Sequence, residues 1–293
     1  MNQTTESFAS LHVAFLGLGL MGGSLALGLR GRCRVLSAYD PDPTVQALAA
    51  SRQVVDLVAP DPASALQQAD LVILAAPVRA ILQLLRQLPD WLPGPAVVLD
   101  LGSTKREIVQ AMDSLPPRFD PVGGHPMCGK ETNSLANADP AIFLEANFAL
   151  TPLERTSHRA RRLAEELCAC LGSRPFWLDA GTHDAWTAAT SHLPYLAAVA
   201  LSLATPVEAS PLAGPGFSSA TRLAESSPAM MLDVLATNRD RILEGLGRYR
   251  QQLDKLERLL AQDTLLELKA SLAMGANRRR EMLAAPRREA GPK

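Results

Sequence analysis

The stretch that decides the fold is His12–Leu29, HVAFLGLGLMGGSLALGL. It opens with four apolar residues, 13–16, which are typical of a buried parallel strand, and closes with the apolar run 24–29, which is typical of a helix. Between them lies a G-x-G-x-x-G pattern, whose glycines and helix-side residues are Gly17, Gly19, Leu20, Met21 and Gly22. In that context the first glycine makes the turn, the second lets the backbone approach a pyrophosphate, and the third lets the helix pack on the sheet.

The helix that follows adds to this prediction, because the free N–H groups at a helix N-terminus attract phosphate. A glycine-rich turn that binds nothing is the alternative, and the strand before it and the helix after it argue against that alternative. The stretch therefore predicts a dinucleotide-binding loop.

An acidic residue ends the next predicted strand, residues 35–40, and lies 23 residues after Gly17. A carboxylate at this place accepts hydrogen bonds from the hydroxyls of the adenine ribose and repels a 2′-phosphate. Asp40 therefore favours NAD over NADP as the cofactor. The alternative is that Asp40 caps a helix or a turn before Pro41.

The composition is that of an ordinary globular protein, with 293 residues, 47% hydrophobic residues, 20% charged residues and a net charge of −1. This length predicts two domains, and the balanced charge gives no field that would attract nucleic acid or a membrane surface. The four cysteines show no metal-binding spacing, so we predict free thiols, no metal site and a cytoplasmic protein. The basic residues near the end (Arg278, Arg279, Arg280, Arg287, Arg288 and Lys293) are interpreted as a solvated tail.

Extended apolar segments alternate with helical segments along the first 180 residues of the chain. The predicted extended segments are 13–16, 35–40, 54–58, 70–78, 96–101, 119–124 and 174–178, and the predicted helices before residue 180 are 24–29, 44–51, 62–68, 81–88, a helix ending near 114, and 155–171. This alternation predicts an α/β fold with a Rossmann-type, doubly wound parallel sheet. Loops at Ala76 and Pro77, at Ser103 and at His125 follow strands, so we expect them to meet at the cofactor.

Everything after residue 181 is predicted to be helical. We expect a dinucleotide-binding domain over 1–152 and an all-helical substrate and dimerisation domain over 153–293. Within it, apolar residues at alternating steps of three and four, broken only at Arg239, are Leu232, Leu235, Ile242, Leu246, Tyr249, Leu253, Leu256 and Leu260. Such a seam indicates either a long helix packed inside its own domain or a contact with a second subunit in a homodimer.

Three groups could carry chemistry. His125, in the stretch GGHPM, lies at a strand end and has a reference pKa near 6.5, so it is a candidate base whose ionisation we expect near that pH; the alternative is a histidine that caps a turn. A pair of Cys128 with His125 as nucleophile lacks an activating third group. His183 and His192 lie nine residues apart and are interpreted as a helix-start cap, together with Asp184, and as a core histidine.

The third group follows the glycine-containing loop 214–217. Arg222 could hold a carboxylate there through its two-pronged guanidinium, and an exposed arginine without a role is the alternative. The substrate would then be a small molecule that carries a carboxylate.

Together these motifs resemble the prephenate and arogenate dehydrogenases of tyrosine biosynthesis. The resemblance runs over residues 12–265 through GLGLMGGSLA, AYDPDP, LAAPV, LDLGSTK, GGHPMCG, HDAWTAATSHLP and ATRLAESSP. It implies a nicotinamide-binding domain, a helical dimerisation domain and an active site between them. It also implies an oxidative decarboxylation, in which a cyclohexadienol ring gives a hydride to NAD, loses CO2 and becomes a phenol.

The resemblance also implies roles for single residues. His125 corresponds to the base, Ser103 to a hydroxyl that orients it, His192 to an active-site histidine and Arg222 to the arginine that binds a substrate carboxylate. Lys130 stands where many relatives have a threonine that contacts substrate, and Tyr195 stands where a second histidine is common. The ACT domain of some relatives has no counterpart in the sequence, so inhibition by tyrosine is expected, if present, at the active site.

Two other classes compete with this interpretation. A β-hydroxyacid dehydrogenase shares the glycine loop, but it needs a catalytic lysine where this sequence has Ser191-His192-Leu193-Pro194. A non-enzymatic NAD-binding regulator would not need His125, Ser103 and Arg222 together. Prephenate is the expected substrate, and the sequence does not separate it from arogenate, which differs by an amino group in place of a keto group.

Overall fold

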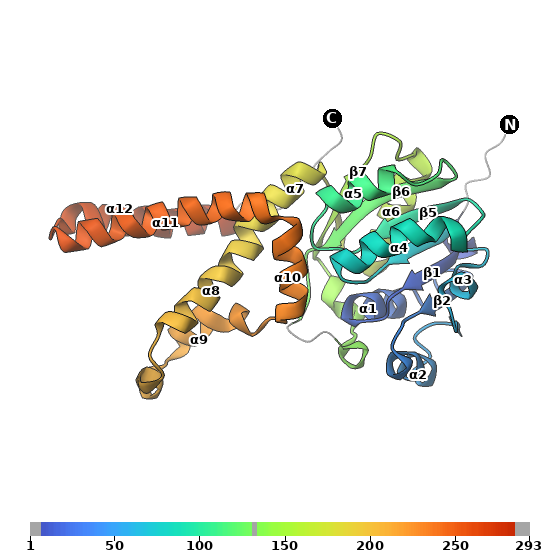
Figure 1. Ribbon diagram of the computed structural model, residues 1–293, viewed down its shortest axis with the longest axis horizontal. Coiled ribbons are helices and arrows are strands. Elements are labelled where there is room, and N and C mark those ends of the chain that lie inside the picture. Colours follow the sequence, from blue (N-terminus) through green and yellow to red (C-terminus); the bar gives the residue numbers. More distant parts are fainter. Residues whose placement is uncertain (1–6, 131–133, 285–293) are drawn as a thin grey trace.

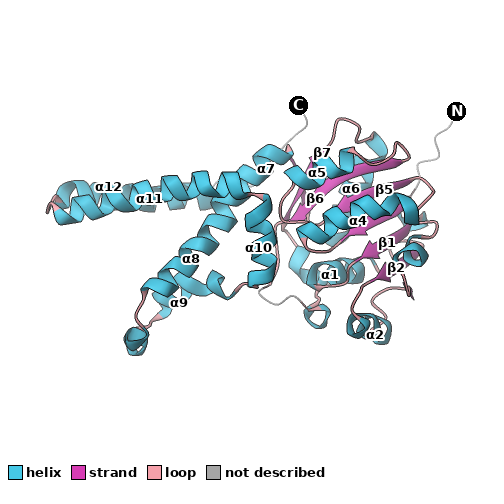
Figure 2. Cartoon of the chain, viewed as in Figure 1, coloured by secondary structure: helices cyan, strands magenta, loops and turns pink. Residues whose placement is uncertain are grey.

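The computed structural model describes residues 7–130 and 134–284, which form a sheet domain and a helical domain (Figures 1 and 2). The predicted tail residues Arg287, Arg288 and Lys293 lie outside the described residues, whereas Arg278, Arg279 and Arg280 belong to the last helix. None of the helices in the described ranges combines the length and the apolarity that crossing a membrane requires.

The sheet domain contains an eight-stranded sheet in the order β3-β2-β1-β4-β5-β6-β7-β8. Its strands are β1 (His12–Leu16), β2 (Val35–Tyr39), β3 (Leu57–Val58), β4 (Leu71–Leu74), β5 (Ala96–Asp100), β6 (Phe119–Pro126), β7 (Asn147–Pro152) and β8 (Arg174–Trp177). All neighbours are parallel except β6 and β7, which are antiparallel. The doubly wound α/β fold is confirmed, and β7 is a strand that the sequence analysis did not predict.

Helices cover both faces of this sheet because the side chains of each buried strand alternate between the faces. They are α1 (Leu20–Leu29), α2 (Pro43–Ser51), α3 (Pro62–Leu66), α4 (Val78–Trp91), α5 (Arg106–Asp113) and α6 (His158–Leu171). Val13 and Phe15 of β1 pack with α1, α2 and α6, whereas Ala14 and Leu16 pack with α3, α4 and α5. The near-continuous apolar strands seen in the sequence are therefore strands that are buried on both faces.

The domain boundary lies later than the sequence analysis placed it. We expected it near residue 152, but α6 and β8 follow that residue and still belong to the sheet domain, since β8 pairs with β7 and α6 packs into its core. The sheet supports a boundary near residue 178, between β8 and α7. The sequence misled because nothing local in α6 or β8 shows that they pack onto the sheet that precedes them.

The helical domain forms two arms that project from the sheet domain (Figure 1). Its helices are α7 (Ala180–Thr187), α8 (Leu193–Ala204), α9 (Pro215–Thr221), α10 (Pro228–Thr237), α11 (Arg239–Ala261) and α12 (Leu265–Ala284). A π-helical turn, Ala188–His192, joins α7 to α8. One arm consists of α8 and α9 and the other of α11 and α12, while α10 lies against the sheet domain.

The apolar seam predicted over 232–260 does not lie on one helix. Asn238 leaves the helical conformation (φ −129°, ψ 27°) and separates α10 from α11. Its buried side chain donates from Nδ2 to the carbonyl oxygen of Asp184 at 2.7 Å. The break thus satisfies a polar contact with α7, and it falls one residue before Arg239, where the seam was interrupted.

The two domains meet at the start of α5, where Arg106 contacts three segments of the helical domain. Its Nε donates to Asp184 at 3.2 Å, its Nη2 donates to Asn238 at 3.2 Å, and its guanidinium forms an ion pair with Asp240. Next to it, the hydroxyls of Thr104 and Thr237 are hydrogen bonded at 2.8 Å. These contacts fix α7 and the start of α11 against the start of α5, just after the carboxyl end of β5.

Candidate active site

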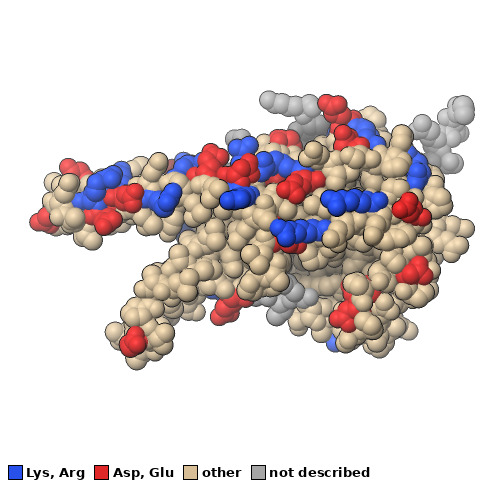
Figure 3. All heavy atoms as spheres, in the orientation of Figure 1, with Lys and Arg blue, Asp and Glu red and all other residues tan. Residues whose placement is uncertain are grey.

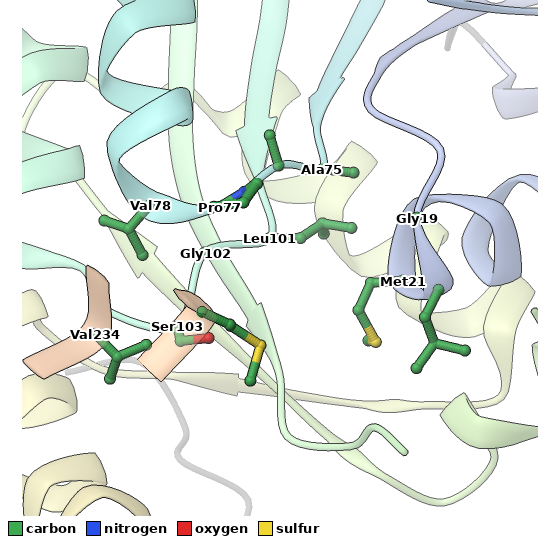
Figure 4. A pocket seen from close by; sticks show the side chains of 12 residues that line it. Gly19, Met21, Ala75, Pro77, Val78, Leu101, Gly102, Ser103 and Val234 are labelled. Carbon is green, nitrogen blue, oxygen red and sulfur yellow. The ribbon is translucent and has the colours of Figure 1, made fainter. Parts of the chain in front are cut away.

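A cavity of about 210 Å³ lies at the carboxyl ends of β1, β4 and β5, where the strand order reverses (Figure 4). Open α/β sheets bind ligands at this place. Its lining residues are Gly19, Leu20, Met21, Ala75, Ala76, Pro77, Val78, Leu101, Gly102, Ser103, Met230 and Val234. The structure thus brings together Gly19, Leu20, Met21, Ala76, Pro77 and Ser103, as predicted, and adds Met230 and Val234 from α10.

The glycine loop has the geometry that its sequence predicts. Gly17 has φ +102°, and a Cβ on it would lie 2.4 Å from the carbonyl oxygen of Ala75. A Cβ on Gly22 would lie 2.4 Å from the carbonyl oxygen of Gly17. Neither position can hold a side chain, so β1, the loop and α1 approach β4 closely. Gly19 precedes α1 without a side-chain cap, which leaves the N-terminal N–H groups of α1 facing the loop.

Asp40 is tied to the glycine loop. Its Oδ2 accepts a hydrogen bond from the N–H of Leu18 at 2.8 Å, and its Oδ1 accepts one from the N–H of Asp42 at 3.0 Å. The cap of α2 is Asp42, which accepts from the N–H of Thr44, so Asp40 is not a helix cap, whereas its bond to the N–H of Asp42 is the turn contact that the alternative interpretation allowed. A carboxylate has about four acceptor positions, so these two hydrogen bonds leave Asp40 able to accept from further donors.

A chain of hydrogen bonds runs from His125 into the helical domain. Nδ1 of His125, at the end of β6, lies 2.9 Å from Nε2 of His183 on α7. Nδ1 of His183 lies 2.8 Å from Oδ1 of Asp184. His183 and Asp184 are buried, whereas His125 is partly exposed. The helix-start cap expected of His183 and Asp184 is wrong, because Asp179 caps α7 by accepting from the N–H of Thr182.

The surroundings hold the two rings neutral and the carboxylate charged. Desolvation lowers the pKa of His125 well below 6.5, and the neighbouring His183, Lys105 and His192 lower it further because each disfavours a second positive charge beside it. Burial also lowers the pKa of His183, although its hydrogen bond to Asp184 opposes that shift. For Asp184, burial alone would raise the pKa, but hydrogen bonds from His183 and from the N–H groups of Arg106 and Lys105 lower it below its ordinary value.

A buried ion pair supports the residue before His125. The side chains of Lys105 and Asp100 are both 0% exposed, and their charged groups are in contact. Nζ of Lys105 also donates to the carbonyl oxygen of Gly124 at 2.6 Å, while Asp100 accepts from the N–H groups of Gly102 at 2.7 Å and Gly124 at 3.1 Å. Asp100 therefore joins the cavity loop, through Gly102, to the backbone that carries His125.

His192 is buried at the end of the π-helical turn, and its Nδ1 lies 3.3 Å from Nδ2 of Asn238. Burial lowers its pKa to about 4, with Asp184 opposing the shift and His183 adding to it. Residues nine apart on a regular α-helix face different ways, but here a π turn, a feature common at functional sites, lies between His183 and His192. Both rings lie near enough to His125 to lower its pKa.

Of the other predicted residues, Ser103 lines the cavity, whereas Arg222 and Lys130 do not. Among the described residues, no hydrogen bond joins Ser103 to His125, and the ring of His125 is held by His183 instead. Arg222 is exposed at the start of a short 3₁₀ helix, Arg222–Glu225, and does not line the cavity. Lys130 is exposed and forms an ion pair with Asp139 at 3.2 Å.

Sequence reasoning missed Lys105, Asp100 and the roles of His183 and Asp184. Lys105 and Asp100 flank the turn after β5, and a lysine and an aspartate at the end of an apolar strand were the available signal. For His183 no local signal exists, because its partner lies 58 residues away on another domain.

Two family models match the chain. The model described as prephenate dehydrogenase, nucleotide-binding domain, matches residues 25–175, and the model described as prephenate dehydrogenase, dimerization domain, matches residues 179–274. The two matches meet beside the boundary that the sheet supports.

Individual proteins agree with these models. The chain is 33% identical to prephenate dehydrogenase from Bacillus subtilis over 277 residues, which cover 90% of this chain and 72% of that protein. It is 30% identical to cyclohexadienyl dehydrogenase from Zymomonas mobilis, over 87% of this chain and 92% of that one.

Solved structures show the same similarity. Prephenate dehydrogenase from A. aeolicus in complex with hydroxyphenyl propionate and NAD+ has a TM-score of 0.87 and 27% identity, and the match covers 94% of this chain and 100% of that one. Arogenate dehydrogenase from Synechocystis has a TM-score of 0.81 and 29% identity, over 93% and 100% of the two chains.

Proposed function

The chain belongs to the prephenate dehydrogenase family, and we propose that it catalyses the NAD-dependent oxidative decarboxylation of prephenate to 4-hydroxyphenylpyruvate, a step of tyrosine biosynthesis. The observation that carries this proposal is the pairing of a neutral, partly exposed histidine, His125, with a dinucleotide cavity on the neighbouring strand. The family relation to B. subtilis prephenate dehydrogenase gives the substrate class.

The residues of the cavity fit NAD. Gly17 and Gly22 let the loop and α1 pack closely against the end of β4, and α1, which begins after Gly19, presents its N-terminus to a phosphate. Asp40 retains acceptor positions for the ribose hydroxyls, and its charge disfavours a 2′-phosphate. Ala76, Pro77 and the other lining residues would enclose the nicotinamide end. When bound, NAD supplies the acceptor for the hydride.

His125 performs the proton chemistry. Its neutral ring accepts the proton of the ring hydroxyl as the hydride leaves the carbon that bears this hydroxyl. The bond to the ring carboxylate then breaks, CO2 departs, and the bonding electrons make the ring aromatic. The proton returns from His125 to the oxygen and gives the phenol, so the substrate has lost one hydride and one CO2 and the histidine is regenerated.

We assign the remaining predicted residues to substrate. Arg222 would bind a carboxylate of the side chain or ring, since guanidinium pairs with carboxylate through two hydrogen bonds. His192 lies close enough to His125 to affect its pKa, and it would contact the same substrate. Ser103 lines the cavity where the reacting ring would meet the nicotinamide. Lys130 would contact substrate at the rim.

The helical domain supports a homodimer. Large apolar side chains stand exposed along both arms, among them Leu203 (83%), Val207 (82%), Leu212 (90%) and Leu266 (84%). Within residues 193–221 the only charged residue is Glu208, and Figure 3 shows the arm of α8 and α9 with almost no charged groups on the visible face. Exposed apolar area of this kind marks an interaction surface, and the family model over 179–274 is a dimerization domain. We also place the protein in the cytoplasm, because its four cysteines are free.

The test follows NADH formation by the purified protein with prephenate and, separately, with arogenate. Formation of NADH and 4-hydroxyphenylpyruvate from prephenate is the expected result. NADH formed from arogenate alone would reassign the protein to the arogenate branch of the family, for which the Synechocystis structure is the precedent. No NADH from either substrate would overturn the proposal.

A further inference from the structure

We propose that His183 is a positioning residue that fixes the tautomer of His125, so that Nε2 of His125 carries the free electron pair that faces the substrate. The inference deepens the proposed function, because it rests on His125 being the base and says what makes it one. It uses the contacts that join β6 of the sheet domain to α7 of the helical domain.

The far end of this series of hydrogen bonds is the carboxylate of Asp184, which can only accept hydrogen bonds. Asp184 receives the backbone N–H of Lys105 on Oδ1 at 2.7 Å, and the backbone N–H of Arg106 on Oδ2 at 3.0 Å. Nε of Arg106 adds a third donor at 3.2 Å. Three donors hold this carboxylate in its ionised form, at the N-terminus of α5, where the helix dipole also favours negative charge.

The direction of the other two hydrogen bonds follows from this end. Because Asp184 is an acceptor, the atom of His183 that lies 2.8 Å away, Nδ1, must carry a hydrogen. In a neutral imidazole the other nitrogen is then an acceptor. Nε2 of His183 therefore accepts from Nδ1 of His125 at 2.9 Å, and Nε2 of His125 is left without a hydrogen.

The opposite arrangement is unfavourable. If His183 carried its hydrogen on Nε2, the lone pair of Nδ1 would face a carboxylate oxygen inside the protein, and two buried acceptors would be in contact. A charged His183 is also disfavoured, because burial lowers its pKa. The charged groups that act on the pair from neighbouring elements are Lys105, Asp100 and Asp184, and His192 is the other titratable ring.

The same series of hydrogen bonds stabilises the proton that His125 accepts from the substrate. The hydroxyl proton of the substrate forms a bond to Nε2 of His125, whose ring becomes positive. Its Nδ1–H then donates a stronger, charge-assisted hydrogen bond to His183. His183 in turn donates to the carboxylate of Asp184. When the proton returns to the product oxygen, His125 is neutral again and the hydrogen bonds are as they were, and no other group is consumed.

The test replaces His183 with Leu, which removes the acceptor, and with Gln, whose amide oxygen can accept from Nδ1 of His125. His158→Leu, an exposed histidine on α6, is the matched control. We expect His183→Leu to lower kcat about 100-fold, the lower end of a general base contribution, while the KM for NAD changes little. Gln should restore kcat to within about tenfold of the unaltered protein, and the control should leave it unchanged.

The second readout is the protonation of the His125 ring, seen by NMR of protein with ¹⁵N-labelled histidine. The chain has five histidines, and the His125 signals are those lost in His125→Asn. We expect a hydrogen on Nδ1 in the unaltered protein and in His183→Gln, and a shift toward Nε2–H in His183→Leu.

Two results would overturn the inference. One is a His125 ring with its hydrogen on Nε2 in the unaltered protein at neutral pH, which needs no variant to fold. The other is a folded His183→Leu protein with kcat within threefold of the unaltered one. The NMR readout does not depend on turnover, so a failure of the proposed reaction with either substrate is distinguished from a failure of the tautomer assignment.

Discussion

Replacing Lys105 with Met tests the buried ion pair behind the candidate base. Met keeps most of the volume of the side chain and removes its charge. Asp100, whose side chain is 0% exposed, would then be an uncompensated buried charge, and the carbonyl oxygen of Gly124 would lose a donor. Breaking a buried pair on one side costs roughly 3–5 kcal/mol. Because Asp100 keeps two backbone N–H donors, we expect about 3 kcal/mol.

The measurement is urea unfolding followed by circular dichroism, on four proteins that form a double-mutant cycle. Asp100→Asn removes the charge that Lys105→Met leaves behind, so the double variant should be more stable than Lys105→Met alone. A cycle isolates this coupling from other losses. The reasoning is refuted if Lys105→Met costs less than about 1 kcal/mol, or if adding Asp100→Asn destabilises it further.

The remaining predictions concern activity and assembly. His125→Asn should lower kcat roughly 10²–10⁴-fold in the NADH assay with little change in NAD affinity, and equal turnover would contradict its role. Desolvation and the neighbouring His183 and Lys105 lower the pKa of His125, and the base must be neutral. We therefore expect kcat/KM to rise with pH through an ionisation below 6.5, the value expected from sequence, and to be level at pH 7; a rise centred above pH 6.5 argues against this base. Asp40→Ser should narrow the preference for NAD over NADP, whereas equal use of both by the unaltered protein excludes the assigned role. Leu253→Arg, on the exposed side of α11, should shift the sedimentation coefficient from that of a dimer to that of a monomer. An unaltered protein that is monomeric at micromolar concentration would contradict the proposed homodimer.

The features that the sequence predicted are those whose signals are local. The glycine loop needs only Gly17 and Gly22 within one turn, and their close approach to the backbone is a steric requirement that the sequence states directly. Buried strands such as β1 and β5 appear as apolar runs because both faces are covered. Asp40 follows its strand at a distance that the fold sets.

The features that it missed depend on contacts between distant segments. The apolar steps of three and four resume at Ile242 after the single interruption at Arg239, so periodicity alone could not show that Asn238 turns its side chain inward to Asp184 and ends α10. The assignment of β7 and β8 to the sheet depends on pairing partners, which periodicity does not identify. A domain boundary drawn near residue 152, where the pattern of segments changes, therefore fell between these two strands.

The candidate base itself depends on such a contact. His125 is carried by β6, its partner His183 by α7, and the carboxylate of Asp184 is held by backbone N–H groups at the start of α5. The same carboxylate accepts a hydrogen bond from the side chain of Arg106, which also forms an ion pair with Asp240 on α11. Neither domain alone therefore contains a complete base. The tautomer of His125 is set only when α7 is docked against β6 and the start of α5, so the contacts that join the domains also make the site chemically competent.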